Sequence, residues 1–220
     1  MKFAFPPADP VTLPIMGEDA RFPVRRIYCL GQNYADHVLE MGGTMERHEP
    51  TIFTKAAEAI VFSGQEIPFP PNTQNLHYEV ELVVAIGPDD INNGVFGYAV
   101  GIDLTRRDLQ SAAKQAGKPW DRAKNFQYSA PCSALTRADN IDVSHARIVL
   151  RKNGDIVQSG STAQMIWSID EIITQLKTDM DLQPGDLIYT GTPEGVGPVI
   201  IGDELSGGIE GLERISVRFI

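Results

Sequence analysis

The sequence contains little cysteine and no long apolar segment. Its two cysteines, Cys29 and Cys132, form no CxxC metal pattern and are too few for a disulfide scaffold. We expect two buried free thiols in a reducing compartment rather than a single bridge. The longest apolar run, Val80 to Ile86, is interrupted by Glu81 and falls far short of the ~20 residues that a membrane span needs. The first residues lack a signal peptide's apolar core, so we expect a soluble, cytoplasmic protein with no membrane partner.

Basic residues are also scarce. Lys and Arg number 19 against 29 Asp and Glu, which gives a formal net charge of −10 with neutral His. Because no block of basic residues offsets this charge locally, we expect no nucleic-acid partner. The net charge does not argue against a small anionic substrate, since a bound cation can invert the electrostatic field inside one pocket.

The chain is organised as one large domain. Its 220 residues carry 15 prolines and 20 glycines, scattered as turns between short elements without an internal repeat. The Pro-rich residues 1–23 predict an arm across the body or a partner subunit, followed by one domain over residues 24–220. Apolar and alternating runs predict strands at 25–31, 51–54, 59–62, 77–86, 96–104, 146–150, 156–158, 187–190 and 214–220. With short helices expected at 32–41, 105–115 and 169–176, the chain is β-rich α+β and not a Rossmann or TIM pattern.

Two local signals are specific. Asn153-Gly154 separates two β-like runs and favours a tight hairpin, because both central turn residues must accept positive φ. Ser168 and Glu171 form a capping box, which predicts a helix that starts after Ser168. The apolar residues of that helix share one face: Ile169, Ile172, Ile173 and Leu176.

Three acidic residues suggest a cation site. Glu79 and Glu81 alternate with apolar residues on one strand, so both carboxylates point to the same side, roughly 7 Å apart. Asp103 ends another apolar strand, where an acid is rarely buried without a partner. Three hard oxygen ligands favour Mg²⁺ or Mn²⁺ over zinc. The alternatives are a solvated outer face for the two glutamates, and for Asp103 a helix cap or a pair with Arg106 or Arg107.

A second group of residues offers proton transfer and anion binding. His37 and Glu40 lie three apart in a short helix, where the carboxylate can orient the imidazole as a general base. Lys124, in a loop-like stretch, can stabilise negative charge or be merely solvated. The turn 190–197 lacks the sequence of a phosphate loop and instead predicts backbone N–H groups and Thr192 presented to a carboxylate.

Together these stretches resemble the fumarylacetoacetate hydrolase family over residues 24–220. The motifs stand in family order: Gly31-Gln-Asn-Tyr-Ala-Asp-His37-Val-Leu-Glu40, His77-Tyr-Glu79-Val-Glu81, Gly101-Ile-Asp103-Leu-Thr, Lys124 and Tyr189-Thr-Gly-Thr-Pro-Glu-Gly-Val-Gly-Pro198. The resemblance implies a mixed β-sandwich roll of the family's C-terminal-domain type with a few short helices, assembled as a homodimer. Gln32, where many relatives carry Arg, and Ala56, where many carry Pro, depart from the pattern and bear on substrate choice.

The resemblance also implies the site. Glu79, Glu81 and Asp103 would hold one Mg²⁺ or Mn²⁺, His37 and Glu40 would activate water, and Lys124 would act as a cation on the substrate side. Tyr34, Gln110, Lys124 and Thr192 are the expected substrate contacts. The compact chain looks most like the acylpyruvate and fumarylpyruvate hydrolases, which implies cleavage of a small 2-oxo acid to pyruvate and a carboxylic acid. The departing pyruvate enolate would be stabilised by the metal.

Two other functions are compatible with the sequence. Oxaloacetate decarboxylation, or a catabolic isomerisation or decarboxylation, would use the same fold and metal without an attacking water. A non-catalytic β-rich binding domain would instead leave Glu79 and Glu81 more than half exposed and Asp103 far from both. A metal site requires the three carboxylates to converge within roughly 5 Å of a common point.

Overall fold

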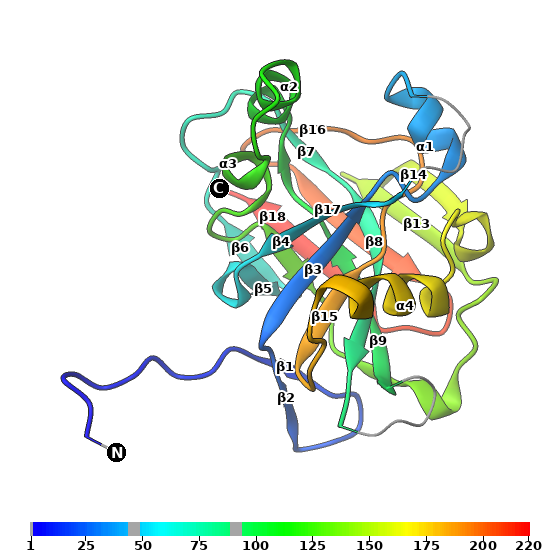
Figure 1. Cartoon of the computed structure of the whole chain (residues 1–220). Helices are drawn as coiled ribbons and strands as arrows, with labels where there is room; N and C mark the ends of the chain where they lie inside the picture. The colour runs from blue at the N-terminus through cyan, green and yellow to red at the C-terminus, as the bar shows by residue number, and fades with distance from the viewer. Residues whose placement is uncertain (1, 44–48, 89–93) are drawn as a thin grey trace.

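The computed structural model of the chain describes residues 2–43, 49–88 and 94–220, and strands dominate these residues (Figure 1). The helices of this part are few and short: α1 (Ala35–Glu40), α2 (Arg107–Gln115), α3 (Asp121–Lys124) and α4 (Ile169–Asp179). Short 3-10 helices of one turn each are η1 (Ala57–Ala59), η3 (Ala138–Asn140) and η4 (Thr162–Gln164). The expected β-rich α+β class is therefore confirmed.

The central sheet is mixed and runs in the order β4-β3-β15-β8-β9-β11-β5, with β12 also paired to β9. Its strands are β3 (Arg26–Gly31), β4 (Thr51–Lys55), β5 (Ile60–Phe62), β8 (Val80–Ile86), β9 (Val95–Ile102), β11 (Ala130–Cys132), β12 (Thr136–Arg137) and β15 (Asp186–Tyr189). The β15–β3 and β11–β5 pairs are parallel and the others antiparallel. Every residue of β8 is buried, because both faces of the sheet are covered.

A second, antiparallel-rich sheet packs on the first. Its order is β14-β13-β17-β18-β6, formed by β6 (Gln65–Ile67), β13 (Arg147–Lys152), β14 (Asp155–Ser161), β17 (Glu204–Ile209) and β18 (Ile215–Phe219). Leu150 and Val217 meet Leu82 and Val100 of the central sheet in one apolar cluster. The turn between β13 and β14 confirms the predicted hairpin, since Asn153 and Gly154 have φ of 53° and 93°.

A small third sheet corrects the prediction of one strand over residues 77–86. The chain breaks at Glu79: β7 (Leu76–Tyr78) pairs with β10 (Thr105–Arg106) and β16 (Gly197–Val199), whereas β8 belongs to the central sheet. Alternation alone could not show this change of sheet, because apolar and polar residues keep the same phase across it. The pairing of Thr105 with His77 also delays the start of α2 to Arg107.

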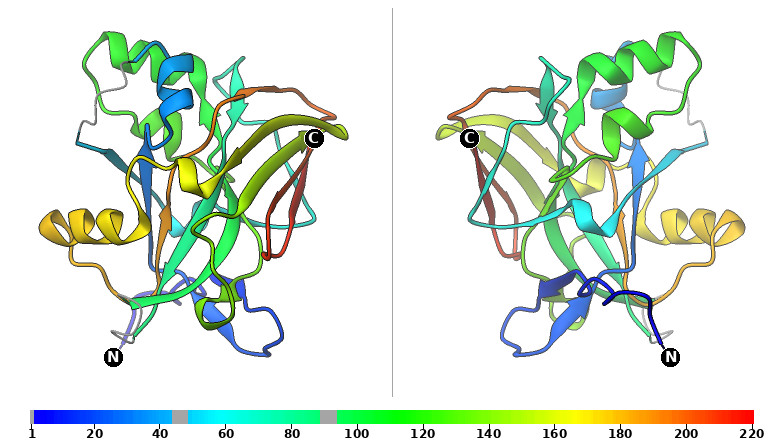
Figure 2. Two further views of the ribbon diagram at one scale, coloured as in Figure 1. Left: turned by 90° about the vertical axis from the view of Figure 1, so that its right-hand side faces the viewer. Right: turned by 90° about the vertical axis from the view of Figure 1, so that its left-hand side faces the viewer.

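Helices α1, α2 and α3 lie near one another beside one end of the sheets, and α4 covers one outer face (Figure 2). The predicted capping box is present in α4, where Ser168 and Glu171 each bond to the other's backbone N–H. Ile172, Ile173 and Leu176 pack against Tyr28 and Ile188 of the sheet.

The N-terminal segment is partly folded onto the body. Residues 2–10 are exposed, while β1 (Thr12–Pro14) and β2 (Arg21–Pro23) form a hairpin that buries Leu13 and Phe22 against the central sheet. Cys29 and Cys132 are buried free thiols, as expected. None of the helices in the described part of the chain has the length and apolar character needed to cross a bilayer.

Candidate active site

The three predicted carboxylates converge in the interior. Glu79 lies in the break between β7 and β8, Glu81 follows in β8, and Asp103 comes directly after β9, which pairs with β8. The backbone N–H of Asp103 donates to the carbonyl of Glu79 at 2.8 Å, which fixes the two strand ends side by side. One carboxylate oxygen from each residue lies within 4.8 Å of the other two. The residues are 5%, 1% and 1% exposed, which excludes a solvated outer face.

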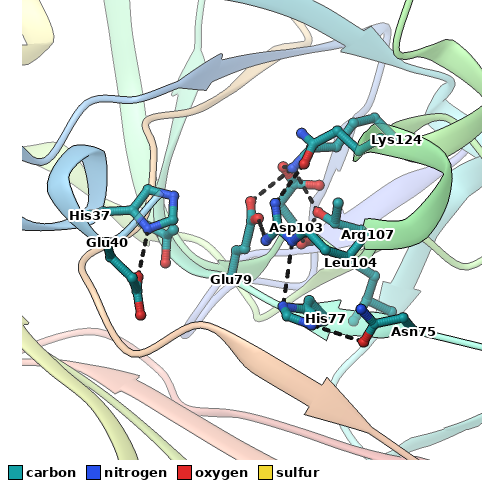
Figure 3. A network of polar contacts seen from close by, with 12 residues as sticks. His37, Glu40, Asn75, His77, Glu79, Asp103, Leu104, Arg107 and Lys124 are labelled. Carbon is teal, nitrogen blue, oxygen red and sulfur yellow. Dashed lines mark hydrogen bonds and ion pairs between the residues drawn. The ribbon is translucent and has the colours of Figure 1, made fainter. Parts of the chain in front are cut away.

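Three basic side chains form ion pairs with this acidic cluster. Two of them, Lys124 and Arg107, are labelled in Figure 3. Lys124 Nζ, at the end of α3, lies 2.8 Å from Glu79 Oε2 and 2.6 Å from Asp103 Oδ2. Lys55 Nζ, at the end of β4, lies 2.9 Å from Asp103 Oδ1 and also donates to the Lys124 carbonyl. Arg107 Nη2 pairs with Glu79 Oε1. The three carboxylates and the three cations therefore cancel in formal charge.

Glu81 is the carboxylate of the cluster without a basic partner among the described residues. Its Oε2 accepts the Gly191 N–H at 2.8 Å. Burial, followed by the nearby charges of Asp103 and Glu79, raises the pKa of Glu81 well above its usual range. Burial alone would also raise the pKa of Glu79, but Lys124 and Arg107 outweigh it and lower that pKa. Glu81 is thus a buried carboxylate without a basic partner in the described part of the chain, and it lies close to carboxylate oxygens of Glu79 and Asp103. This arrangement of three hard oxygen donors fits a small divalent cation.

His37 and Glu40 form the expected pair on α1. His37 Nδ1 lies 3.0 Å from Glu40 Oε2, and the other Glu40 oxygen accepts the Gly195 N–H at 3.0 Å. Gly195 has a φ of +92°, and an added Cβ would collide with the Val157 carbonyl oxygen, so the turn requires glycine here.

The turn over residues 190–197 therefore presents backbone N–H groups to carboxylates, but these belong to the protein. Gly191 serves Glu81 and Gly195 serves Glu40. Thr192 borders the cavity, yet its hydroxyl already donates to the Val80 carbonyl and accepts from Gln158.

One small cavity joins the acidic cluster to the dyad. His37, Glu79, Glu81, Gln110, Lys124 and Thr192 are among the residues that line it. Gln32 also lines it, in a left-handed backbone conformation with φ of 65°. Tyr34 is not part of this lining. Its ring is buried at the start of α1 and its hydroxyl has no hydrogen-bond partner in the described part of the chain.

Sequence reasoning missed Lys55 as a site residue and considered Arg107 only as a partner of Asp103. In the structure Arg107 pairs with Glu79 instead, and Lys55 is the group that neutralises Asp103 Oδ1. The available signal for Lys55 was a lysine within the strand-like run Thr51-Ile-Phe-Thr-Lys55, where burial demands a partner.

Comparison with known proteins identifies the family of the chain. The sequence profile described as fumarylacetoacetate (FAA) hydrolase C-terminal matches residues 26–219. The chain belongs to the fumarylacetoacetate hydrolase family. Its β-rich architecture is the fold of that family's C-terminal domain.

Individual members of the family resemble the chain closely. A fumarylpyruvate hydrolase from Ralstonia sp is 45% identical over 172 residues, which cover 75% of this chain and 90% of that protein. A mitochondrial oxaloacetate tautomerase from Mus musculus is 42% identical over 203 residues, covering 89% of this chain and 90% of the relative. The crystal structure of fumarylpyruvate hydrolase from Pseudomonas aeruginosa in complex with Mn²⁺ and pyruvate has a TM-score of 0.96 at 44% identity, covering 100% of this chain and 99% of that one.

Proposed function

We propose that the protein is a metal-dependent hydrolase that cleaves a carbon–carbon bond in an acylpyruvate, specifically a fumarylpyruvate-like 2,4-dioxo acid. The observation that carries the proposal is the buried carboxylate cluster, which shares one cavity with a carboxylate-oriented histidine. The relatives named as fumarylpyruvate hydrolases support the reaction class, and the Mn²⁺ of one of them supports a metal at the cluster.

Glu79, Glu81 and Asp103 would hold the ion, with Mg²⁺ or Mn²⁺ as the expected metal because all three donors are carboxylate oxygens. When bound, such an ion supplies Lewis-acid stabilisation of the negative charge that develops on the departing pyruvyl group.

His37 would act as the general base. Glu40 holds Nδ1, so the other ring nitrogen, Nε2, is left to accept a proton from water. The water oxygen then bonds to the carbonyl carbon distal to the 2-oxo acid end, and the bond from that carbon to the pyruvyl methylene breaks. The bonding pair goes to the pyruvyl fragment, which takes up a proton to give pyruvate, while the acyl group leaves as a carboxylic acid. Lys124 would stabilise substrate charge beside the cluster.

The charge of the site supports a dianionic substrate. The three carboxylates are cancelled by Lys55, Lys124 and Arg107, so a dication would leave a formal charge of +2. Fumarylpyruvate carries two carboxylates and matches this charge, whereas a simple acylpyruvate carries one. We expect Gln110 and Arg107, which border the same cavity, to contact such a substrate.

Action on oxaloacetate is the second candidate. Oxaloacetate is also a dianionic 2-oxo acid, and the relatives that act on it by name are tautomerases rather than decarboxylases. Tautomerisation moves a proton at the carbon beside the keto group and needs no attacking water, so His37 could serve it as well.

A substrate panel separates these possibilities. The protein is assayed with fumarylpyruvate, acetylpyruvate and oxaloacetate in Mg²⁺, Mn²⁺ and EDTA, and the products are identified. We expect metal-dependent release of fumarate and pyruvate, with kcat/KM for fumarylpyruvate above that for acetylpyruvate. Enol–keto exchange of oxaloacetate with no cleavage of either diketo acid would favour the tautomerase instead.

We also propose a homodimer, on the resemblance to the family, and a cytoplasmic location, on the sequence expectation given above. Light scattering coupled to size exclusion tests the dimer, and a monomer at micromolar concentration would contradict it.

A further inference from the structure

The guanidinium group of Arg107 is held on all three of its nitrogens. Nη2 pairs with Glu79 Oε1, and Nε donates to His77 Nδ1 at 3.4 Å (Figure 3). Nη1 donates to Gln110 Oε1 at 2.6 Å. The residue is 8% exposed and borders the same cavity as the carboxylate cluster. Its orientation is therefore set by three partners, of which His77 lies outside the cavity lining.

These bonds fix the hydrogen positions of the His77 ring. An arginine N–H can only donate, so Nδ1 of His77 must be an acceptor. In the neutral ring Nε2 then carries the hydrogen and donates to Asn75 Oδ1, which lies 3.0 Å away. The ring is thus oriented from its far side by Asn75 and presents a lone pair to Arg107.

The backbone places these two residues together. Thr105 of β10 pairs with His77 of β7, so Arg107 follows two residues beyond the paired position. The Arg107 N–H donates to the Asn75 carbonyl at 2.8 Å, which ties the first turn of α2 to the segment before β7. Asp108 strengthens this link by accepting from Thr73 Oγ1 at 2.7 Å.

The bonds also define which N–H donors of Arg107 remain for a ligand. A guanidinium carries five N–H donors, and the three side-chain bonds to Glu79, Gln110 and His77 occupy one on each nitrogen. One N–H on each terminal nitrogen remains for an acceptor such as a substrate carboxylate. Because the group is planar, the bond at Nε sets the plane in which these two donors lie.

We propose that His77 is a positioning residue, which locks the plane of the Arg107 guanidinium so that its two remaining N–H groups meet the carboxylate of an anionic substrate in the cavity. This inference rests on the proposed function, because it takes a 2-oxo acid as the ligand. His77 does not touch the substrate; it acts through Arg107.

Three substitutions of His77 test the role of the Nδ1 lone pair. His77→Asn places an amide oxygen near the position of Nδ1, His77→Gln places one near Nε2, and His77→Leu provides neither. We measure kcat and KM for fumarylpyruvate on the full-length, Mn²⁺-loaded protein, and pyruvate binding by calorimetry. His145→Leu makes the same chemical change at an exposed histidine outside the cavity and is the control.

His77→Leu is expected to raise KM by about tenfold with little change in kcat, as loss of a hydrogen bond to a charged group predicts. His77→Asn should restore KM to within about threefold of wild type, and His77→Gln should not. In an Arg107→Met background His77→Leu should add no further loss, because the group it positions is gone. Equal losses in all three variants, or a full additional loss without Arg107, would overturn the inference.

Pyruvate binding separates this inference from the proposed function. If the wild-type protein fails to cleave fumarylpyruvate, the proposed reaction is wrong. The same ranking of variants in pyruvate affinity would then still support the role of His77, and pyruvate affinity that is independent of His77 would overturn it.

Discussion

Glu40 uses its two carboxylate oxygens for two different tasks. One accepts from His37 Nδ1 at 3.0 Å, and the other accepts the Gly195 N–H at 3.0 Å. The glycine-rich turn thus fixes the Glu40 carboxylate, which in turn orients the His37 imidazole. Gly195 of this turn lies about 155 residues further along the chain than Glu40. Water activation by His37 is expected to depend on both contacts.

Replacing His37 should abolish most turnover without removing the metal. His37→Ala is expected to lower kcat by ~10²- to 10⁴-fold, the usual contribution of a general base. His37 is not one of the three clustered carboxylates, so the Mn²⁺ dissociation constant should stay within about twofold of wild type. Steady-state kinetics and calorimetry measure the two quantities, with His145→Ala as the matched control. Loss of Mn²⁺ binding in His37→Ala would show that our division of roles is wrong.

Glu40→Gln tests orientation rather than charge alone. The amide can donate to His37 Nδ1 from its nitrogen, which would place the ring hydrogen on Nε2 and remove the base. By analogy with a serine-protease triad, where an Asp-to-Asn change selects the wrong tautomer, we expect kcat to fall by about 10²-fold or more. Activity close to wild type would mean that Glu40 does not set the tautomer.

Lys55 is expected to contribute measurably to the stability of the protein. Its ammonium group is buried beside Asp103 Oδ1 at 2.9 Å, so Lys55→Met would remove one side of this buried ion pair and leave Lys124 as the remaining cation partner of Asp103 among the described residues. Breaking one side of a buried pair costs about 3–5 kcal/mol in free energy of unfolding. Urea denaturation of the metal-free protein measures this, with the exposed Lys118→Met as control. A loss below about 1 kcal/mol would contradict the assigned pairing.

Metal affinity should rise with pH. Burial and the neighbouring carboxylates raise the pKa of Glu81, so in the metal-free protein this group still binds a proton above the ordinary glutamate range. A metal ion binds only the carboxylate form, so Mn²⁺ must displace that proton. Lowering the pH toward that raised pKa should therefore weaken Mn²⁺ binding. Calorimetry in buffers of different ionisation enthalpy should detect the released proton in wild type and not in Glu81→Gln.

Local sequence signals predicted the parts of the fold that depend on neighbouring residues. The Asn153-Gly154 hairpin and the Ser168 capping box both occur where expected, since each is decided within four residues. The break at Glu79 could not be predicted, because it depends on which distant strands pair on either side: β10 and β16 before it, β9 and β15 after it.

The same distinction between local and long-range signals applies to the site. From the residues alone, Glu79, Glu81 and Asp103 were candidates, because acids embedded in apolar strands need a partner, but a solvated face or a local ion pair stayed open as alternatives. The family resemblance joined the three into one predicted metal site. The contacts of Lys55 could not be predicted in this way, because its ammonium reaches Asp103 only once β4 packs against α3. The sequence indicated Arg107 as an ion-pair partner of Asp103. Its actual pairing with Glu79 depends on the pairing of β7 with β10 and could not be predicted.

Direct titration of Mn²⁺ into metal-free protein, followed by the electron paramagnetic resonance signal of free Mn²⁺, tests the central claim most directly. We predict one tight site per chain in the wild-type protein. Asp103→Asn should weaken it by at least about 100-fold, whereas the remote Asp142→Asn should leave it unchanged. Wild-type affinity in Asp103→Asn, or no tight site in the wild-type chain, would contradict the account.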